Sequence, residues 1–147
     1  MNYILPFLLL ITSLAYGSEV NWTFVKVVDG DTISFINPAL PKELEKVSIR
    51  LYGIDTPEST YLAKCDKEKQ LGLEAKEYVK SLVKDQKLKV IVKEWDKYGG
   101  RVLGDIYIKD QSLKDILISK GYARPYDGGK KSNWCVIENN TRDKKNG

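Results

Sequence analysis

Five segments of the chain alternate apolar and polar residues, which is the pattern of β-strands with one buried face. They are residues 22–28, 32–36, 46–54, 87–95 and 101–108. The first two segments flank Asp29-Gly30, and an Asp-Gly turn between alternating runs is a strong hairpin signal. We therefore expect a hairpin followed by three further strands.

Two other segments show the three- and four-residue spacing of amphipathic helices. In residues 69–83 the apolar positions on one face are Leu71, Ala75, Tyr78, Val79 and Leu82. Residues 112–123 repeat the pattern, with Ser112 as the expected cap and Gly121 as the expected stop. A helix between the third and fourth strands and a second helix after the fifth predict an α+β fold, a five-stranded β-barrel of the OB type with packed helices.

The 147 residues have the length of one domain, and both ends are expected to lie outside its core. Residues 4–15 form an uncharged apolar run of signal-peptide length, and the small residues after it predict cleavage after Gly17. Residues 1–3 contain no Lys or Arg, so an uncleaved anchor is the alternative. We expect a signal peptide over 1–17, a folded domain over 18–138, a polar disordered tail over 139–147, and a secreted or periplasmic location.

The composition limits the chemistry that the chain can perform. It contains no histidine, which excludes Ser-His and Cys-His dyads and zinc sites built on imidazole. Acid–base catalysis must therefore use carboxylates, Lys, Arg or Tyr. The formal net charge of +4 suits a polyanionic partner, although a soluble protein with a basic surface would carry the same charge.

The two cysteines, Cys65 and Cys135, belong to no C-x-x-C or metal-binding pattern. In an oxidising compartment two cysteines more often pair than stay free. A disulfide between them would close a loop of about 70 residues and stabilise the fold by about 4 kcal/mol in chain-entropy models. A Cys65–Cys135 disulfide is thus a prediction that goes with export.

Acidic and basic side chains gather in three short stretches at strand ends and turns. They are VVDGDT at 27–32, RLYGIDTPE at 50–58 and DKYGGR at 96–101. Each stretch alone is also compatible with an ordinary polar turn. Together, in this order and spacing, they resemble the thermonuclease family, the staphylococcal-nuclease-like domain. The resemblance covers about residues 22–135 and includes GLEA on the first helix and GYARPY after the second.

The resemblance implies a Ca²⁺ site next to a catalytic acid. Asp31 and Asp55 would bind the ion through their carboxylates, and Thr56 through its backbone oxygen. Ca²⁺ is a hard cation that prefers oxygen ligands, and a bound metal ion can polarise a phosphoryl oxygen. Glu58 would activate the attacking water as the general base.

The resemblance further implies that Arg50 and Arg101 grip the scissile phosphate. Arginine suits this role because its planar guanidinium can donate two parallel hydrogen bonds to phosphate oxygens, which Lys cannot do. The other implied substrate contacts are Lys97 and Tyr98 at the edge of the pocket and Tyr126 against a base.

The expected function is that of an exported Ca²⁺-dependent nuclease that hydrolyses phosphodiester bonds of DNA and RNA with low sequence specificity. We expect a monomer that prefers single-stranded or denatured nucleic acid and has no stable membrane association after signal cleavage. The alternatives are a non-catalytic OB-fold module that binds nucleic acid, and a phosphoesterase that uses another divalent ion on another polyanion. The presence of Asp31, Arg50, Asp55, Glu58 and Arg101 together favours the enzyme.

Overall fold

The computed structural model describes residues 21–95 and 101–136. The strands are β1 (Thr23–Asp29), β2 (Thr32–Ile36), β3 (Lys46–Leu51), β4 (Ile54–Asp55), β5 (Leu88–Trp95), β6 (Arg101–Ile108), β7 (Gln111–Ser112) and β8 (Arg124–Pro125). The helices are α1 (Asp66–Val83) and α2 (Leu113–Ser119). The expected signal peptide over 1–17 and tail over 139–147 lie outside the described residues. No helix of the described ranges is long and apolar enough to cross a membrane.

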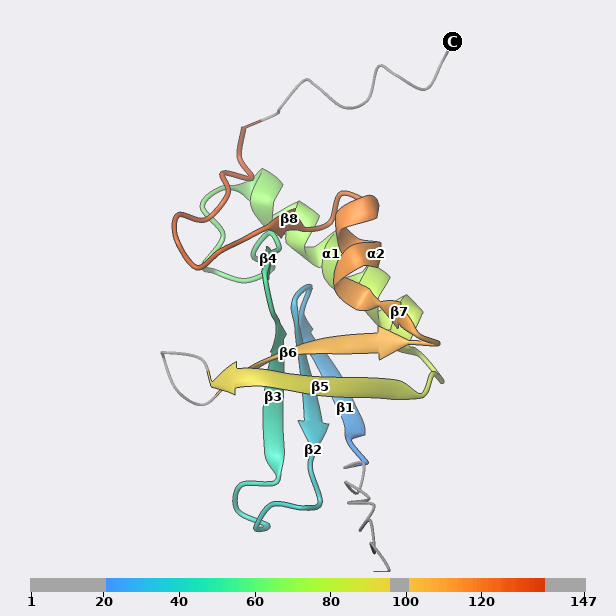
Figure 1. Cartoon of the computed structure of the whole chain (residues 1–147). Helices are drawn as coiled ribbons and strands as arrows, with labels where there is room; N and C mark the ends of the chain where they lie inside the picture. The colour runs from blue at the N-terminus through green and yellow to red at the C-terminus, as the bar shows by residue number, and fades with distance from the viewer. Residues whose placement is uncertain (1–20, 96–100, 137–147) are drawn as a thin grey trace, which may run out of the picture.

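The main sheet is mixed and has the strand order β1-β2-β3-β6-β5, with β7 added to β6. Strands β1, β2 and β3 form an antiparallel meander, β3 pairs with β6 in parallel, and β6 pairs with β5 antiparallel. In Figure 1, β5 and β6 run across the direction of the first three strands, and both helices lie toward one end of them. A mixed sheet with two helices is an α+β fold, as the sequence predicted.

The five long strands lie where the alternation predicts them, but two details differ. The sheet has six strands because β7 pairs with β6, and the predicted strand over 46–54 is divided into β3 and β4. Gly53 causes the division, since its φ of 80° lies in the left-handed region that glycine adopts without strain. Strands β1 and β5 end the described strand order and no pairing joins them there, so closure into a five-stranded OB barrel stays a prediction.

The turn at Gly53 gives β4 a different partner from β3. In β4, Ile54 pairs with Pro125 and Asp55 with Arg124, and these two residue pairs form a second, two-stranded sheet with β8. The β4–β8 sheet brings the segment that follows α2 back to the end of β3. It therefore connects the predicted acidic loop with residues near the end of the described chain.

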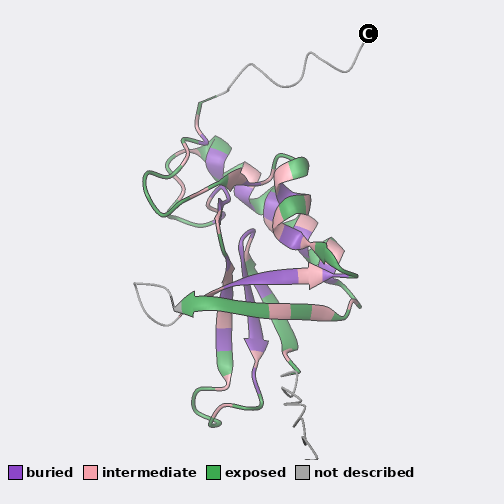
Figure 2. Cartoon of the chain, viewed as in Figure 1, coloured by how far each residue is buried: buried purple, intermediate pink, exposed green. Residues whose placement is uncertain are grey.

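The core lies between the main sheet and the helices, with α1 packed on β1 and α2 on β6. Its fully buried side chains include Phe35, Ile49, Ile106, Val79 and Leu117. Figure 2 shows β2 and β6 mostly buried and β5 largely exposed, so burial is greatest in the centre of the sheet. The helices thus cover one region and leave the other end of the strands open.

Both helices begin at side-chain caps. The hydroxyl of Ser112 accepts a hydrogen bond from the Asp115 N–H, so α2 starts at its predicted cap. Helix α1 begins three residues before the predicted range, because the Cys65 sulfur accepts from the Glu68 N–H and replaces a hydroxyl as cap. The apolar pattern could not indicate this first turn, which is mostly charged.

Candidate active site

The predicted site residues meet in and beside one pocket of about 870 Å³. Its walls come from the β1–β2 turn, β3, the loop after β4, the start of β6 and the segment after β8. The predicted site residues in this lining are Asp31, Arg50, Glu58, Arg101 and Tyr126. Asp55 and Thr56 are buried and do not line the pocket. Lys97 and Tyr98 lie outside the described residues.

The sheet register explains why Arg50 lies next to the acid of the hairpin turn. Arg50 pairs with Thr32 on β2 and with Leu103 on β6, and Asp31 directly precedes Thr32. The Leu51 N–H donates a hydrogen bond of 2.8 Å to the Asp31 carbonyl, which holds the turn against β3. The backbone therefore fixes Asp31 and Arg50 relative to each other.

Arg101 comes to the same face of the sheet from β6. It pairs with Ser48, which precedes Arg50 by two positions on β3, and residues two apart on a strand point to the same face. Ser48 and both arginines line the pocket. The parallel β3–β6 pairing thus gathers two guanidinium groups from segments that are distant in sequence.

Arg50 lies between two buried carboxylates. Its Nη2 atom is 3.1 Å from Asp31 Oδ2 and 3.8 Å from Asp55 Oδ1. The side chains of Arg50, Asp31 and Asp55 are 13%, 5% and 2% exposed, so water screens these charges weakly. The two acids therefore converge on one cation at the inner end of the pocket.

Asp55 is only half satisfied by hydrogen bonds. Its Oδ2 accepts from Trp134 Nε1 at 3.2 Å, whereas its buried Oδ1 has no hydrogen bond among the described residues. Oδ1 lies near two cations, Arg50 and Lys131, whose Nζ is 3.6 Å away. Burial raises the pKa of Asp55 above its ordinary value, against the Trp134 hydrogen bond and the positive charge of Lys131.

This arrangement fits an oxygen-seeking cation. A buried carboxylate oxygen without a hydrogen bond is costly, and a hard cation such as Ca²⁺ would satisfy it. Asp31 supplies a second carboxylate that faces the same guanidinium. No group of three or more acids or cysteines suited to a metal ion occurs within the described residues, so a bound ion would also need carbonyl, water or substrate oxygens.

Helix α1 positions the loop that carries Glu58. The buried carboxylate of Glu68 accepts hydrogen bonds from the Glu58 N–H at 3.4 Å and the Lys64 N–H at 2.7 Å. A Cβ on Gly72 would overlap the Glu58 carbonyl and the Ser59 nitrogen, so only glycine lets the helix approach the loop this closely. The Glu58 carboxylate itself remains in the pocket lining.

The structure adds Lys131 and Trp134, which sequence reasoning missed. Lys131 Nζ lies 3.0 Å from Glu58 Oε1, and the buried Trp134 donates to Asp55. The arginine of β8, Arg124, stacks on the Trp134 ring with its guanidinium carbon 4.1 Å from the ring centroid. The sequence feature that could have indicated both residues is the segment RPYDGGKKSNWC, because it ends at Cys135, the cysteine predicted to form a disulfide with Cys65. The structure does join Cys65 and Cys135 in a disulfide.

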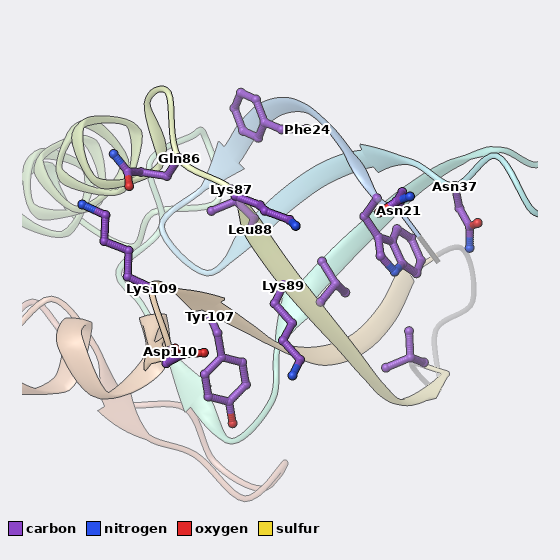
Figure 3. A pocket seen from close by; sticks show the side chains of 13 residues that line it. Asn21, Phe24, Asn37, Gln86, Lys87, Leu88, Lys89, Tyr107, Lys109 and Asp110 are labelled. Carbon is purple, nitrogen blue, oxygen red and sulfur yellow. The ribbon is translucent and has the colours of Figure 1, made fainter. Parts of the chain in front are cut away.

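A second groove, of about 810 Å³, lies between the start of β1, β5 and the end of β6 (Figure 3). Its basic residues are Lys87, Lys89 and Lys109. Asp110 is the one acid among its described lining residues, so it lacks the paired carboxylates seen in the first pocket. None of the predicted site residues lines it, and we assign the chemistry to the first pocket.

Comparison with known proteins finds relatives that are named as nucleases or endonucleases. The chain is 35% identical over 104 residues to Staphylococcal-like nuclease CAN1 of Arabidopsis thaliana, which covers 70% of the chain and 29% of that relative. It is 32% identical over 108 residues to Endonuclease YncB of Bacillus subtilis (strain 168), covering 71% and 47% of the two chains. The match to Probable endonuclease lcl3 of Schizosaccharomyces japonicus is 35% identical over 122 residues and covers 79% and 48%.

The chain spans less than half of the length of each of these relatives. A family model described as Staphylococcal nuclease homologue matches residues 48–147, about two thirds of the chain. That range contains both arginines, Asp55 and Glu58, whereas Asp31 precedes it. The protein therefore belongs to the family of staphylococcal nuclease homologues.

Proposed function

We propose that the chain is an exported Ca²⁺-dependent nuclease that hydrolyses phosphodiester bonds of DNA and RNA with low sequence specificity. The observation that carries this proposal is the position of Arg50 between Asp31 and Asp55, in a pocket that Glu58 and Arg101 also line. Two acids for a cation, two guanidiniums for a phosphate and one further carboxylate are what metal-assisted hydrolysis of a phosphodiester requires.

The residues that would hold the ion are Asp31 and Asp55, through their carboxylates, and Thr56, through its backbone oxygen. When bound, Ca²⁺ would supply Lewis-acid polarisation of the phosphate and lower the pKa of water. The orphaned Oδ1 of Asp55 supports this assignment, because it is buried and has no hydrogen bond within the described residues.

The protein residues have separate tasks in the proposed reaction. Arg50 and Arg101 bind the phosphate oxygens and stabilise the charge that develops on them. Arg50 is oriented by its ion pairs before any substrate arrives, so little reorganisation opposes its use. Glu58 accepts the proton of the attacking water in the pocket.

The remaining features of the proposal concern substrate and location. Tyr126 lines the pocket, and an aromatic ring stacks most readily on the exposed face of an unpaired base, which favours single-stranded or denatured nucleic acid. The Cys65–Cys135 disulfide supports export to an oxidising compartment, where such bonds persist. We further propose that the protein acts as a monomer without stable membrane association.

The proposal is tested by cleavage of denatured DNA in Ca²⁺ and in EGTA by four purified proteins. They are the unaltered protein, Glu58→Gln, Arg50→Ala and the control Glu77→Gln, which changes an exposed glutamate on α1. We expect cleavage only with Ca²⁺, a loss of about 10² to 10³ in turnover for Arg50→Ala, and no loss for the control. Equal cleavage in EGTA would exclude the metal mechanism, and tight DNA binding without cleavage would favour the non-catalytic binding module.

A further inference from the structure

Residues 126–136, which we call the strap, run across the active-site end of the molecule. Figure 1 shows the strap, in red, beside the loop that leads from β4 to α1. At its start the Tyr126 N–H donates to the Gly53 carbonyl at 2.9 Å, directly after the β4–β8 pairing. Near its other end Cys135 is bonded to Cys65, the cap residue of α1. The strap is therefore attached on both sides of the loop that carries Asp55 and Glu58.

The inner surface of the strap is also anchored. Trp134 is buried, donates to Asp55 and carries Arg124 on its ring. The second Arg124 contact is a hydrogen bond of 3.4 Å from Nη1 to the Asn133 carbonyl. These contacts define where the strap backbone lies, and hence where the side chains of its middle residues can reach.

Lys131 extends from the middle of the strap into the pocket. Its Nζ is 3.0 Å from Glu58 Oε1 and 3.6 Å from Asp55 Oδ1. Partial burial acts to lower the pKa of Lys131, but the hydrogen bond and charge of Glu58 raise it overall, so the ammonium stays charged. The side chain of Lys131 is 42% exposed and that of Glu58 is 23% exposed, so this pair lies in the pocket opening and not in the core.

The Glu58 carboxylate needs such a partner to have a fixed direction. The Glu58 backbone is held by Glu68 and Gly72, but these contacts leave the rotatable bonds of its side chain free. Within the described residues, the Glu58 carboxylate forms an ion pair with Lys131. A general base must be aligned with the proton that it accepts, and misplacement by about 1 Å can cost about 10² in rate.

We propose that Lys131 is a positioning residue for Glu58, and that the Cys65–Cys135 disulfide holds Lys131 in place through the strap. This inference rests on the proposed nuclease function. The disulfide then has a catalytic consequence in addition to its stabilising one: a chain with free thiols keeps its sheet and arginines but loses the alignment of Glu58.

Steady-state cleavage of a short single-stranded oligonucleotide tests the role of Lys131. Lys131→Met keeps the aliphatic stem and removes the charge, Lys131→Arg keeps the charge, and Lys130→Met alters the exposed neighbour as a matched control. We expect Lys131→Met to lower kcat about 10- to 100-fold with little change in KM, Lys131→Arg to recover most of that loss, and the control to match the unaltered protein. An unchanged kcat would overturn the inference. A raised KM alone would also overturn it, since Lys131 would then bind the substrate and not position Glu58.

The role of the disulfide is tested with Cys65→Ser combined with Cys135→Ser. Serine at position 65 can still accept from the Glu68 N–H, so the cap of α1 is kept. We expect kcat to fall as in Lys131→Met. The triple variant, which combines both cysteine changes with Lys131→Met, should lose no more activity than either the double cysteine variant or Lys131→Met, because all of these changes remove the same Lys131–Glu58 contact. Independent, multiplying losses would overturn the link between the strap and Lys131. Circular dichroism at the assay temperature confirms that each variant is folded.

A measurement without metal or substrate separates this inference from the proposed function. The ¹³C signal of the Glu58 carboxyl, assigned by its absence in Glu58→Gln, should shift at fixed pH in Lys131→Met and in the cysteine variant, but not in Lys130→Met. An unmoved signal overturns the positioning role even if the protein is an active nuclease. If the unaltered protein cleaves nothing, the proposed function is overturned. The NMR signal would then still report the contact between Lys131 and Glu58, but that contact would have no role in catalysis.

Discussion

Removal of the Trp134 hydrogen bond to Asp55 tests the electrostatics of the site. Trp134→Phe keeps a large buried ring and deletes only the Nε1–H that binds Asp55 Oδ2 at 3.2 Å. Because Oδ1 already has no hydrogen bond within the described residues, the substitution leaves a buried carboxylate with none. A hydrogen bond to a charged group is worth about 1.5–3 kcal/mol, so we expect the free energy of unfolding to fall by about that amount at pH 7.

The assay is urea unfolding followed by circular dichroism, performed as a cycle with Asp55→Asn. The amide carries no charge, so Trp134→Phe should cost clearly less in the Asp55→Asn background. Asp55→Asn alone should raise stability, since burial disfavours the ionised form that it replaces.

The effect of pH has a definite sign. The pKa of Asp55 is raised in the folded protein, so ionisation costs stability; this cost shrinks as the pH falls below the raised value and is gone below the ordinary value. The Trp134 hydrogen bond favours the ionised form, so the penalty of Trp134→Phe is present above that pH and fades below it. An equal penalty in both backgrounds and at both ends of the pH range would refute this reasoning.

Three further predictions follow from the same region. Gly72→Ala should lower stability by about 1–3 kcal/mol in urea unfolding and also reduce turnover, since the new Cβ pushes on the Glu58 carbonyl; a variant with normal stability would show that the loop yields freely. Asp29→Asn should raise the free energy of unfolding at pH 7, because burial raises the pKa of Asp29 despite the Ser59 hydrogen bond and the charged form is therefore disfavoured. The same substitution should remove part of the stability that the protein gains on acidification. Ca²⁺ at a hundredfold excess over its Kd should stabilise the fold by about 2.7 kcal/mol in thermal unfolding, and Asp31→Ala should abolish that gain; an equal gain in the variant would place the ion elsewhere.

The sequence predicted those parts of the fold that rest on local pattern. Alternation located the long strands, and the Ser112 hydroxyl located the start of α2. The sequence pattern could not indicate β4 and β8, because a strand of two residues is too short to show an alternation of apolar and polar positions. The pairing of these strands also depends on the turn at Gly53. The start of α1 was missed for a related reason, since a cysteine served as its cap.

The candidate site divides in the same way. The three motifs were recognisable because the charged residues of each lie within a few positions of one another, and the β2–β3–β6 register then brings Asp31, Arg50 and Arg101 to one pocket. The contact of Lys131 with Glu58 spans 73 positions and that of Trp134 with Asp55 spans 79. Nothing local distinguishes Lys131 from Lys130, so only the path of the strap identifies it.

The parallel pairing of β3 with β6 has a consequence for biosynthesis. Arg50 is translated well before Arg101, and the residues of α1 and β5 lie between them in the chain. Such long-range pairing is slow, because the intervening chain must be ordered first. A nascent polypeptide that has not yet released β6 therefore has only one of the two pocket arginines, and the enzyme that we propose would stay latent toward the messenger that encodes it until β3 and β6 have paired.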